Sequence, residues 1–77
     1  MTLNDLKPNE SGVITDIRIT GRTKCRLIDM GVTVGTRITM LCAAPLGDPV
    51  AYSVLGYQLC LRRSETRKIQ IERCGNS

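Results

Sequence analysis

The sequence predicts a mainly β domain: a small barrel of five short strands with one short α-helix. The chain has 77 residues, which is enough for a single hydrophobic core. Apolar and polar residues alternate in several short segments, as they do in half-buried strands. Only residues 23–30 show helical spacing. Closing five short strands into a barrel would remove sheet edges that otherwise invite aggregation, so a partly closed barrel fits best.

The first half of the chain predicts a lead-in, a strand and the helix. Residues 3–12 contain polar residues and a turn, and we expect a strand over 13–19. One face of this strand carries Val13, Thr15, Ile17 and Ile19, and the other carries Ile14, Asp16 and Arg18. Gly31 directly follows the predicted helix over 23–30, where a residue with positive φ commonly ends a helix.

The second half predicts four more strands. Gly35 opens the second strand, in which Ile38, Met40 and Cys42 should face the core. A loop over 44–49 leads to a strand over 50–54, a turn at Leu55-Gly56, a strand over 57–62, a turn over 64–67 and a strand over 68–72. We expect one domain over 1–77, with its core in 3–72 and a frayed tail over 73–77. An SH3-like barrel is the first choice, and an OB-fold, whose loops need more chain, is the second.

Composition argues against several functions. Two Tyr, no Phe and no Trp leave no platform for stacking bases and no aromatic groove for proline-rich ligands. The net charge of +4 is scattered, so nucleic-acid binding is a minor alternative. Without histidine, a cysteine or hydroxyl nucleophile has no ordinary base. No segment resembles a P-loop, a signal peptide or a membrane span. We therefore expect a cytoplasmic binding protein, with no enzymatic activity and no cofactor.

The four cysteines leave one alternative open. They stand at positions 25, 42, 60 and 74, without a Cys-x-x-Cys pair. Cys42 is predicted to be a core thiol, whereas Cys60 should lie on the outer face beside Gln58 and Arg62. If Cys25, Cys42, Cys60 and Cys74 converged, within one chain or across a homo-oligomer, they could hold a transition metal such as Zn or Fe.

The loop over 45–49 is the most specific local pattern. Two prolines fix φ, and Gly47 allows conformations that other residues resist, so the loop should be rigid. It is either a stiff hairpin connection or a preformed surface on which Leu46 and Asp48 meet a partner. We join Leu46 and Asp48 with Arg62 and Arg63 as candidate partner-binding residues. The helix surface around Lys24 and Arg26 is the alternative.

The order of several short motifs resembles the FeoA family over about residues 3–72. These motifs are Leu27-Ile28-Asp29-Met30-Gly31, Pro45-Leu46-Gly47-Asp48-Pro49, Gly56-Tyr57, Leu61-Arg62-Arg63 and Ile69-Gln70-Ile71. The resemblance implies an SH3-like domain of bacterial ferrous iron uptake. It also implies a partner, the membrane permease FeoB, whose cytosolic G-protein region it would bind and modulate. The chain departs from the family pattern in its higher cysteine count and in residues 64–67, where a more apolar turn with Ala is expected.

Overall fold

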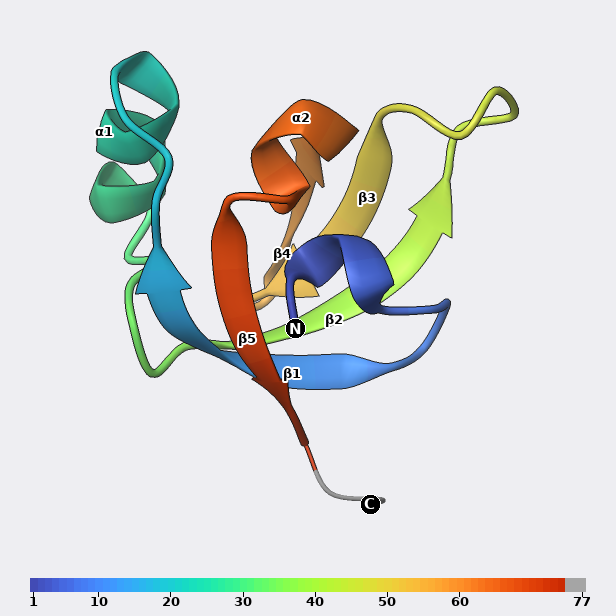
Figure 1. The fold of residues 1–77 in the computed structure, drawn as a ribbon, viewed down its shortest axis with the longest axis horizontal. Helices are drawn as coiled ribbons and strands as arrows, with labels where there is room; N and C mark the ends of the chain where they lie inside the picture. The colour runs from blue at the N-terminus through green and yellow to red at the C-terminus, as the bar shows by residue number, and fades with distance from the viewer. Residues whose placement is uncertain (75–77) are drawn as a thin grey trace.

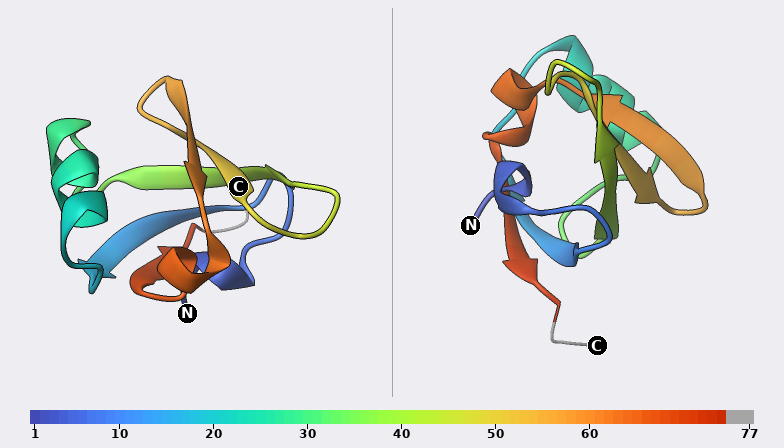
Figure 2. Two further views of the ribbon diagram at one scale, coloured as in Figure 1. Left: turned by 90° about the horizontal axis from the view of Figure 1, so that it is seen from above. Right: turned by 90° about the vertical axis from the view of Figure 1, so that its right-hand side faces the viewer.

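The computed structural model describes residues 1–74 and shows five antiparallel strands. The strands are β1 (Ser11–Ile17), β2 (Arg37–Ala43), β3 (Val50–Val54), β4 (Tyr57–Leu61) and β5 (Ile69–Arg73). Their order in the sheet is β4-β3-β2-β1-β5. The sheet curls around the core, as Figures 1 and 2 show, but in residues 1–74 the outermost strands β4 and β5 do not pair with each other. The predicted mainly β, five-stranded class is confirmed.

In the described part of the chain, three short helices accompany the sheet: η1 (Leu3–Asp5, a 3-10 helix), α1 (Arg22–Asp29) and α2 (Arg63–Thr66). The sequence predicted only α1, and α2 stands where a turn over 64–67 was expected. The Glu65 carboxylate accepts a hydrogen bond from the Arg62 backbone N–H at 2.9 Å, which satisfies a free donor at the start of α2. The buried Thr66 hydroxyl donates to the Arg63 carbonyl at 3.1 Å. Polar residues that are also typical of a β-turn form the short helix α2 here, because their side chains bond to its backbone.

The end of α1 agrees with the prediction. Gly31 has a φ of 84°, and its N–H donates to the Ile28 carbonyl at 2.9 Å. The Val32 N–H donates to the Leu27 carbonyl at 2.7 Å. These two bonds form a Schellman motif, in which the left-handed glycine turns the chain back. The turn sends Val32 into the core, where it joins Leu27, the one buried residue of α1.

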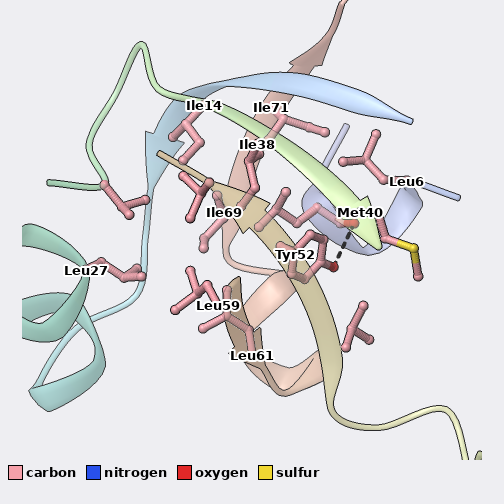
Figure 3. Packing of buried hydrophobic residues seen from close by; sticks show 14 of the residues in the cluster. Leu6, Ile14, Leu27, Ile38, Met40, Tyr52, Leu59, Leu61, Ile69 and Ile71 are labelled. Carbon is pink, nitrogen blue, oxygen red and sulfur yellow. Dashed lines mark hydrogen bonds between the residues drawn. The ribbon is translucent and has the colours of Figure 1, made fainter. Parts of the chain in front are cut away.

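The core is aliphatic and is arranged around one tyrosine (Figure 3). Tyr52 of β3 is 1% exposed, and its hydroxyl donates to the Leu3 carbonyl at 3.2 Å, so its polar end is satisfied inside the core. Leu3 and Leu6 are buried beside it. The N-terminal lead-in is therefore part of the core, which sequence reasoning treated only as an approach to the first strand.

Two β-bulges change which side chains face inward. The register shifts between Ile14 and Asp16 of β1, and again between Met40 and Cys42 of β2. An extra residue at a bulge interrupts the period-2 alternation of a strand. Before the bulge in β1, Gly12 and Ile14 are buried and Thr15 is exposed, whereas after it Ile19 is buried, so the inward positions change from even to odd numbers. The prediction that Cys42 is a core thiol is wrong, because the bulge turns this residue outward and leaves it exposed.

The N-terminal residues cover the outer edge of β5. The Ile71 N–H donates to the Met1 carbonyl at 2.8 Å, and Thr2 forms a bridge with Gln70. At the other end, β5 continues through Arg73, one residue beyond the predicted strand. The Cys74 N–H then donates to the Ser11 carbonyl at 3.1 Å. Of the predicted frayed tail, residues 75–77 lie outside the part described by the structure.

Candidate partner-binding site

The structure brings the loop over 44–49 together with the start of α2. The Arg63 backbone N–H donates to Asp48 Oδ1 at 3.0 Å, so this carboxylate satisfies one of the free N–H groups at the helix start. The Arg63 Nε donates to the Gly47 carbonyl at 2.6 Å. All four predicted partner-binding residues, Leu46, Asp48, Arg62 and Arg63, thus belong to one surface, which we call the loop–α2 surface.

Arg63 holds this surface together. Besides the bond to Gly47, its guanidinium donates from Nη1 to the Asn4 Oδ1 at 2.7 Å. One planar side chain therefore joins the loop, α2 and the N-terminal segment, a task suited to the fixed geometry of guanidinium donors. Arg63 was predicted to be a partner-binding residue, but its side chain is half-buried and positions the loop instead.

The loop presents Leu46 to solvent. Leu46 is 97% exposed, although leucine is among the residue types most often buried. Its loop is closed by hydrogen bonds from the Gly47 N–H to the Ala44 carbonyl at 2.7 Å and from the Ala44 N–H to the Pro49 carbonyl at 3.0 Å. Gly47 has a φ of 89°, which only glycine adopts without strain. The loop is thus preorganised around an apolar side chain at its tip.

Arg62 lies beside this loop and remains free to make contacts. Its side chain is exposed, and with Asp48 and Pro49 it lines a shallow hollow of about 220 Å³. An apolar anchor next to an arginine and a carboxylate is typical of protein–protein contacts, in which Arg and apolar anchors contribute most of the binding energy. The arrangement is suited to binding a protein.

The alternative surface lies on α1. Lys24 and Arg26 are exposed there, as the sequence predicted, and the helix borders an open, shallow hollow of about 700 Å³ lined by residues within 20–29. The Thr23 hydroxyl donates to Glu65 Oε2 at 2.7 Å, which ties α1 to α2. The Tyr57 hydroxyl donates to the Met30 carbonyl, and this hydrogen bond connects the end of α1 to β4. Sequence reasoning missed Glu65 as the residue that joins the two helices.

The tie at Glu65 should make stability depend on pH. The Arg62 N–H lowers the pKa of Glu65 most, and the Thr23 hydroxyl lowers it further. Burial opposes them by raising this pKa, and the guanidinium groups of Arg26 and Arg62 lower it by smaller amounts. Because the folded pKa lies below the usual value of about 4.3, this contribution is complete above that pH. It is lost as the pH falls through the folded value.

We therefore expect Glu65→Gln to lower the melting temperature at pH 7 and to have a smaller effect at pH 3, which lies below the unfolded pKa, so that part of this contribution is lost there. Thermal unfolding of both proteins at the two pH values measures this. Glu72→Gln is the matched control, since Glu72 is exposed and its loss changes the charge equally. A Glu65→Gln effect of the same size at both pH values would contradict the prediction.

The structure does not bring the four cysteines together within residues 1–74 of one chain. Within residues 1–74, no three or more His, Cys, Asp or Glu side chains are placed to hold a metal ion. Cys25 lies on α1, and Cys74 follows β5. Cys42 and Cys60 both pair with Ala51, from the two sides of β3, so an alanine separates them on the outer face of the sheet. The outward placement of Cys60 near Gln58 is confirmed, with the amide Nε2 3.9 Å from its sulfur.

Membrane insertion through a helix finds no support in residues 1–74, where every helix is too short or too polar to cross a bilayer.

Comparison with known proteins identifies relatives along almost the whole chain. The family model described as "FeoA domain" matches residues 1–73. The Fe(2+) transport protein A/Fe(2+) transporter FeoB fusion protein of Porphyromonas gingivalis is 36% identical over 72 residues, which cover 94% of this chain. The chain spans only 8% of the length of that relative.

Solved structures agree with this match. The solution structure of a FeoA protein from Chlorobium tepidum has a TM-score of 0.93 at 30% identity, covering 100% of this chain and 73% of that one. The crystal structure of Stenotrophomonas maltophilia FeoA complexed with zinc, described as a prokaryotic SH3 domain protein, has a TM-score of 0.77 at 25% identity, covering 94% of this chain and 89% of that one. The predicted SH3-like fold is thereby confirmed.

Proposed function

This chain belongs to the FeoA family, and we propose that it binds the cytosolic G-protein region of a FeoB-type ferrous iron permease and modulates its activity. The family is an accessory component of ferrous iron transport. One observation carries the proposal: in the Porphyromonas gingivalis relative, a segment 36% identical to this chain is part of the same polypeptide as the transporter. Domains fused in one chain remain at high effective concentration, which favours even a weak contact between them.

The loop–α2 surface is the part of the molecule that we assign to this contact. Leu46 supplies an apolar anchor that is already held outward, so little conformational freedom is lost when it enters a pocket. Arg62 and Asp48 border the anchor with opposite charges. The contact would lie on the cytosolic side of the membrane and would alter transport or GTP hydrolysis by favouring one state of the G-protein region.

We expect this protein to retain detergent-solubilised FeoB in a pull-down at micromolar concentrations. The Leu46→Ser/Arg62→Ala double variant should bind at least about tenfold more weakly, because it loses both the anchor and its charged neighbour. Leu55→Ser is the matched control, since Leu55 is a 56% exposed leucine at the turn between β3 and β4. GTP hydrolysis by FeoB, measured with and without each protein, reports the modulation.

Two outcomes would change the proposal. If folded wild-type protein fails to bind FeoB with and without nucleotide, the binding function is wrong. If Lys24→Glu/Arg26→Glu abolishes binding while the loop double variant binds normally, the contact lies on α1 and our assignment of the surface is wrong.

A further inference from the structure

The basic residues are scattered along the sequence, but the fold brings most of the net charge of +4 into one part of the molecule. Eight of the eleven basic residues lie on α1, on α2 or close to them. Four acidic residues lie in the same part: Asp16, Asp29, Asp48 and Glu65. The other three basic residues, Lys7, Arg37 and Arg73, are balanced by three acidic ones. Both helices lie at the upper side of Figure 1. We call this part the basic end, and its basic residues are Arg18, Arg22, Lys24, Arg26, Arg62, Arg63, Arg67 and Lys68.

Specific contacts hold the basic end together. The Arg18 N–H donates to the Lys68 carbonyl at 2.7 Å, which places the residues before α1 beside those after α2. The hydrogen bond between Thr23 and Glu65, 2.7 Å long, joins the two helices. Positions 18, 26, 62 and 68 therefore lie on neighbouring segments, although they are far apart in the sequence.

Few of these charges are neutralised within the protein. Across residues 1–74 there are two ion pairs: Arg18 with Asp16 at 3.1 Å and Arg73 with Glu10 at 3.4 Å. Arg22, Lys24, Arg26, Arg67 and Lys68 are exposed and have no such pair. An unpaired cluster of this sign attracts polyanions and anionic surfaces.

Two exposed apolar side chains indicate which anionic surface fits. Ile28 is 52% exposed and Val34 is 61% exposed. Together with Lys24 and Ile17 they line a shallow hollow of about 260 Å³. Basic residues beside exposed aliphatic ones are typical of proteins that lie on a bilayer, where the charges contact headgroups and the apolar side chains enter the acyl boundary. A nucleic acid would use the charges but would gain little from Ile28 or Val34, and it would lack aromatic stacking partners.

We propose that the basic end docks on an anionic lipid bilayer, with Arg22, Lys24 and Arg26 at the headgroup phosphates and Ile28 and Val34 at the acyl boundary. This contact would orient the protein at the membrane that contains its transporter partner. Although Arg62 and Arg63 belong to both the basic end and the loop–α2 surface, the bilayer contact uses residues of α1 together with Val34. It leaves Leu46 free, so it does not depend on the contact proposed for the loop–α2 surface.

Co-sedimentation with lipid vesicles tests the proposal. The protein should bind vesicles that contain phosphatidylglycerol and phosphatidylcholine at low ionic strength, release from them as salt rises, and fail to bind phosphatidylcholine alone. Each basic residue near an anionic surface strengthens binding by roughly fivefold, so Arg22→Gln/Lys24→Gln/Arg26→Gln should weaken it by about 100-fold. Lys7→Gln/Arg37→Gln/Arg73→Gln is the control, because it removes the same charge from outside the basic end.

A second pair of measurements tests the apolar part. Ile28→Ser/Val34→Ser should weaken vesicle binding while leaving binding to double-stranded DNA, if any, unchanged. The proposal is overturned if the wild-type protein ignores anionic vesicles at low salt, if both triple variants lose binding equally, or if the Ile28/Val34 variant binds as wild type. Thermal unfolding confirms that each variant is folded. Because detergent-solubilised FeoB offers no bilayer, failure of the pull-down and failure of this test are separate results.

Discussion

Replacing Leu27 with alanine is expected to lower the free energy of unfolding by about 3 kcal/mol. Leu27 is 1% exposed and is the one buried residue of α1, so its loss leaves a cavity and removes the main apolar contact of that helix. A domain of this size rarely has more than about 3–5 kcal/mol of stability from its core. The variant should therefore be close to unfolding at room temperature, and α1 should detach first.

Urea denaturation gives the free energy, and amide hydrogen exchange shows whether α1 opens before the sheet. Ile28→Ala is the matched control on the neighbouring position, because Ile28 is 52% exposed and its truncation should change stability by no more than about 0.5 kcal/mol. Equal effects of the two substitutions would show that α1 does not depend on Leu27 for its attachment.

Replacing Arg63 with alanine is expected to cost about 2 kcal/mol, the second largest effect. The substitution removes the bonds from the guanidinium to the Gly47 carbonyl and to Asn4 Oδ1 and leaves both acceptors without this donor. Arg63→Lys should restore little, because an ammonium group at the end of a flexible chain cannot replace the spread donors of a guanidinium. The backbone bond from Arg63 to Asp48 should survive in both variants.

Arg62→Ala is the natural control, since it removes the neighbouring, exposed guanidinium and should leave stability nearly unchanged. Urea denaturation measures all three variants. Chemical shifts of the Gly47 and Asp48 amides should move in Arg63→Ala and stay in place in Arg62→Ala. If Arg63→Lys were as stable as the wild type, a positive charge alone would suffice, and the geometry we assign to Arg63 would be unnecessary.

The parts of the fold that the sequence predicted are those with local causes. The helix end at Gly31 follows from its φ of 84°, and the turn at Leu55-Gly56, where both residues have positive φ, is likewise local. Side chains of β4 follow an uninterrupted alternation, and the pairing of β4 with β3 has no register shift. Cys42 was predicted wrongly because the bulge before it depends on how β2 pairs with β3, which one strand's sequence does not reveal.

In the candidate site, too, the residues with local causes were predicted, and those that depend on distant residues were not. Leu46 and Asp48 were predicted from the loop's own prolines and glycine, and Arg62 from its outward position in the strand predicted over 57–62. The inward turn of Arg63 could not be foreseen, since it depends on Asn4, 59 residues away in the sequence. The role of Glu65 was missed for a related reason: its partner Thr23 is 42 residues away, and a Ser-Glu-Thr run by itself is as typical of a turn as of a helix.

Met1 and Thr2 cover a sheet edge that would otherwise favour aggregation at high protein concentration. Met1 and Thr2 occupy the outer side of β5 through the Met1 carbonyl and the bridge to Gln70. Without them, the Ile69-Gln70-Ile71 segment of β5 would offer unpaired N–H and C=O groups to another molecule, and strand edges start aggregation in this way. An affinity tag or fluorescent label attached directly before Met1 would therefore disturb the pairing that covers this edge of β5.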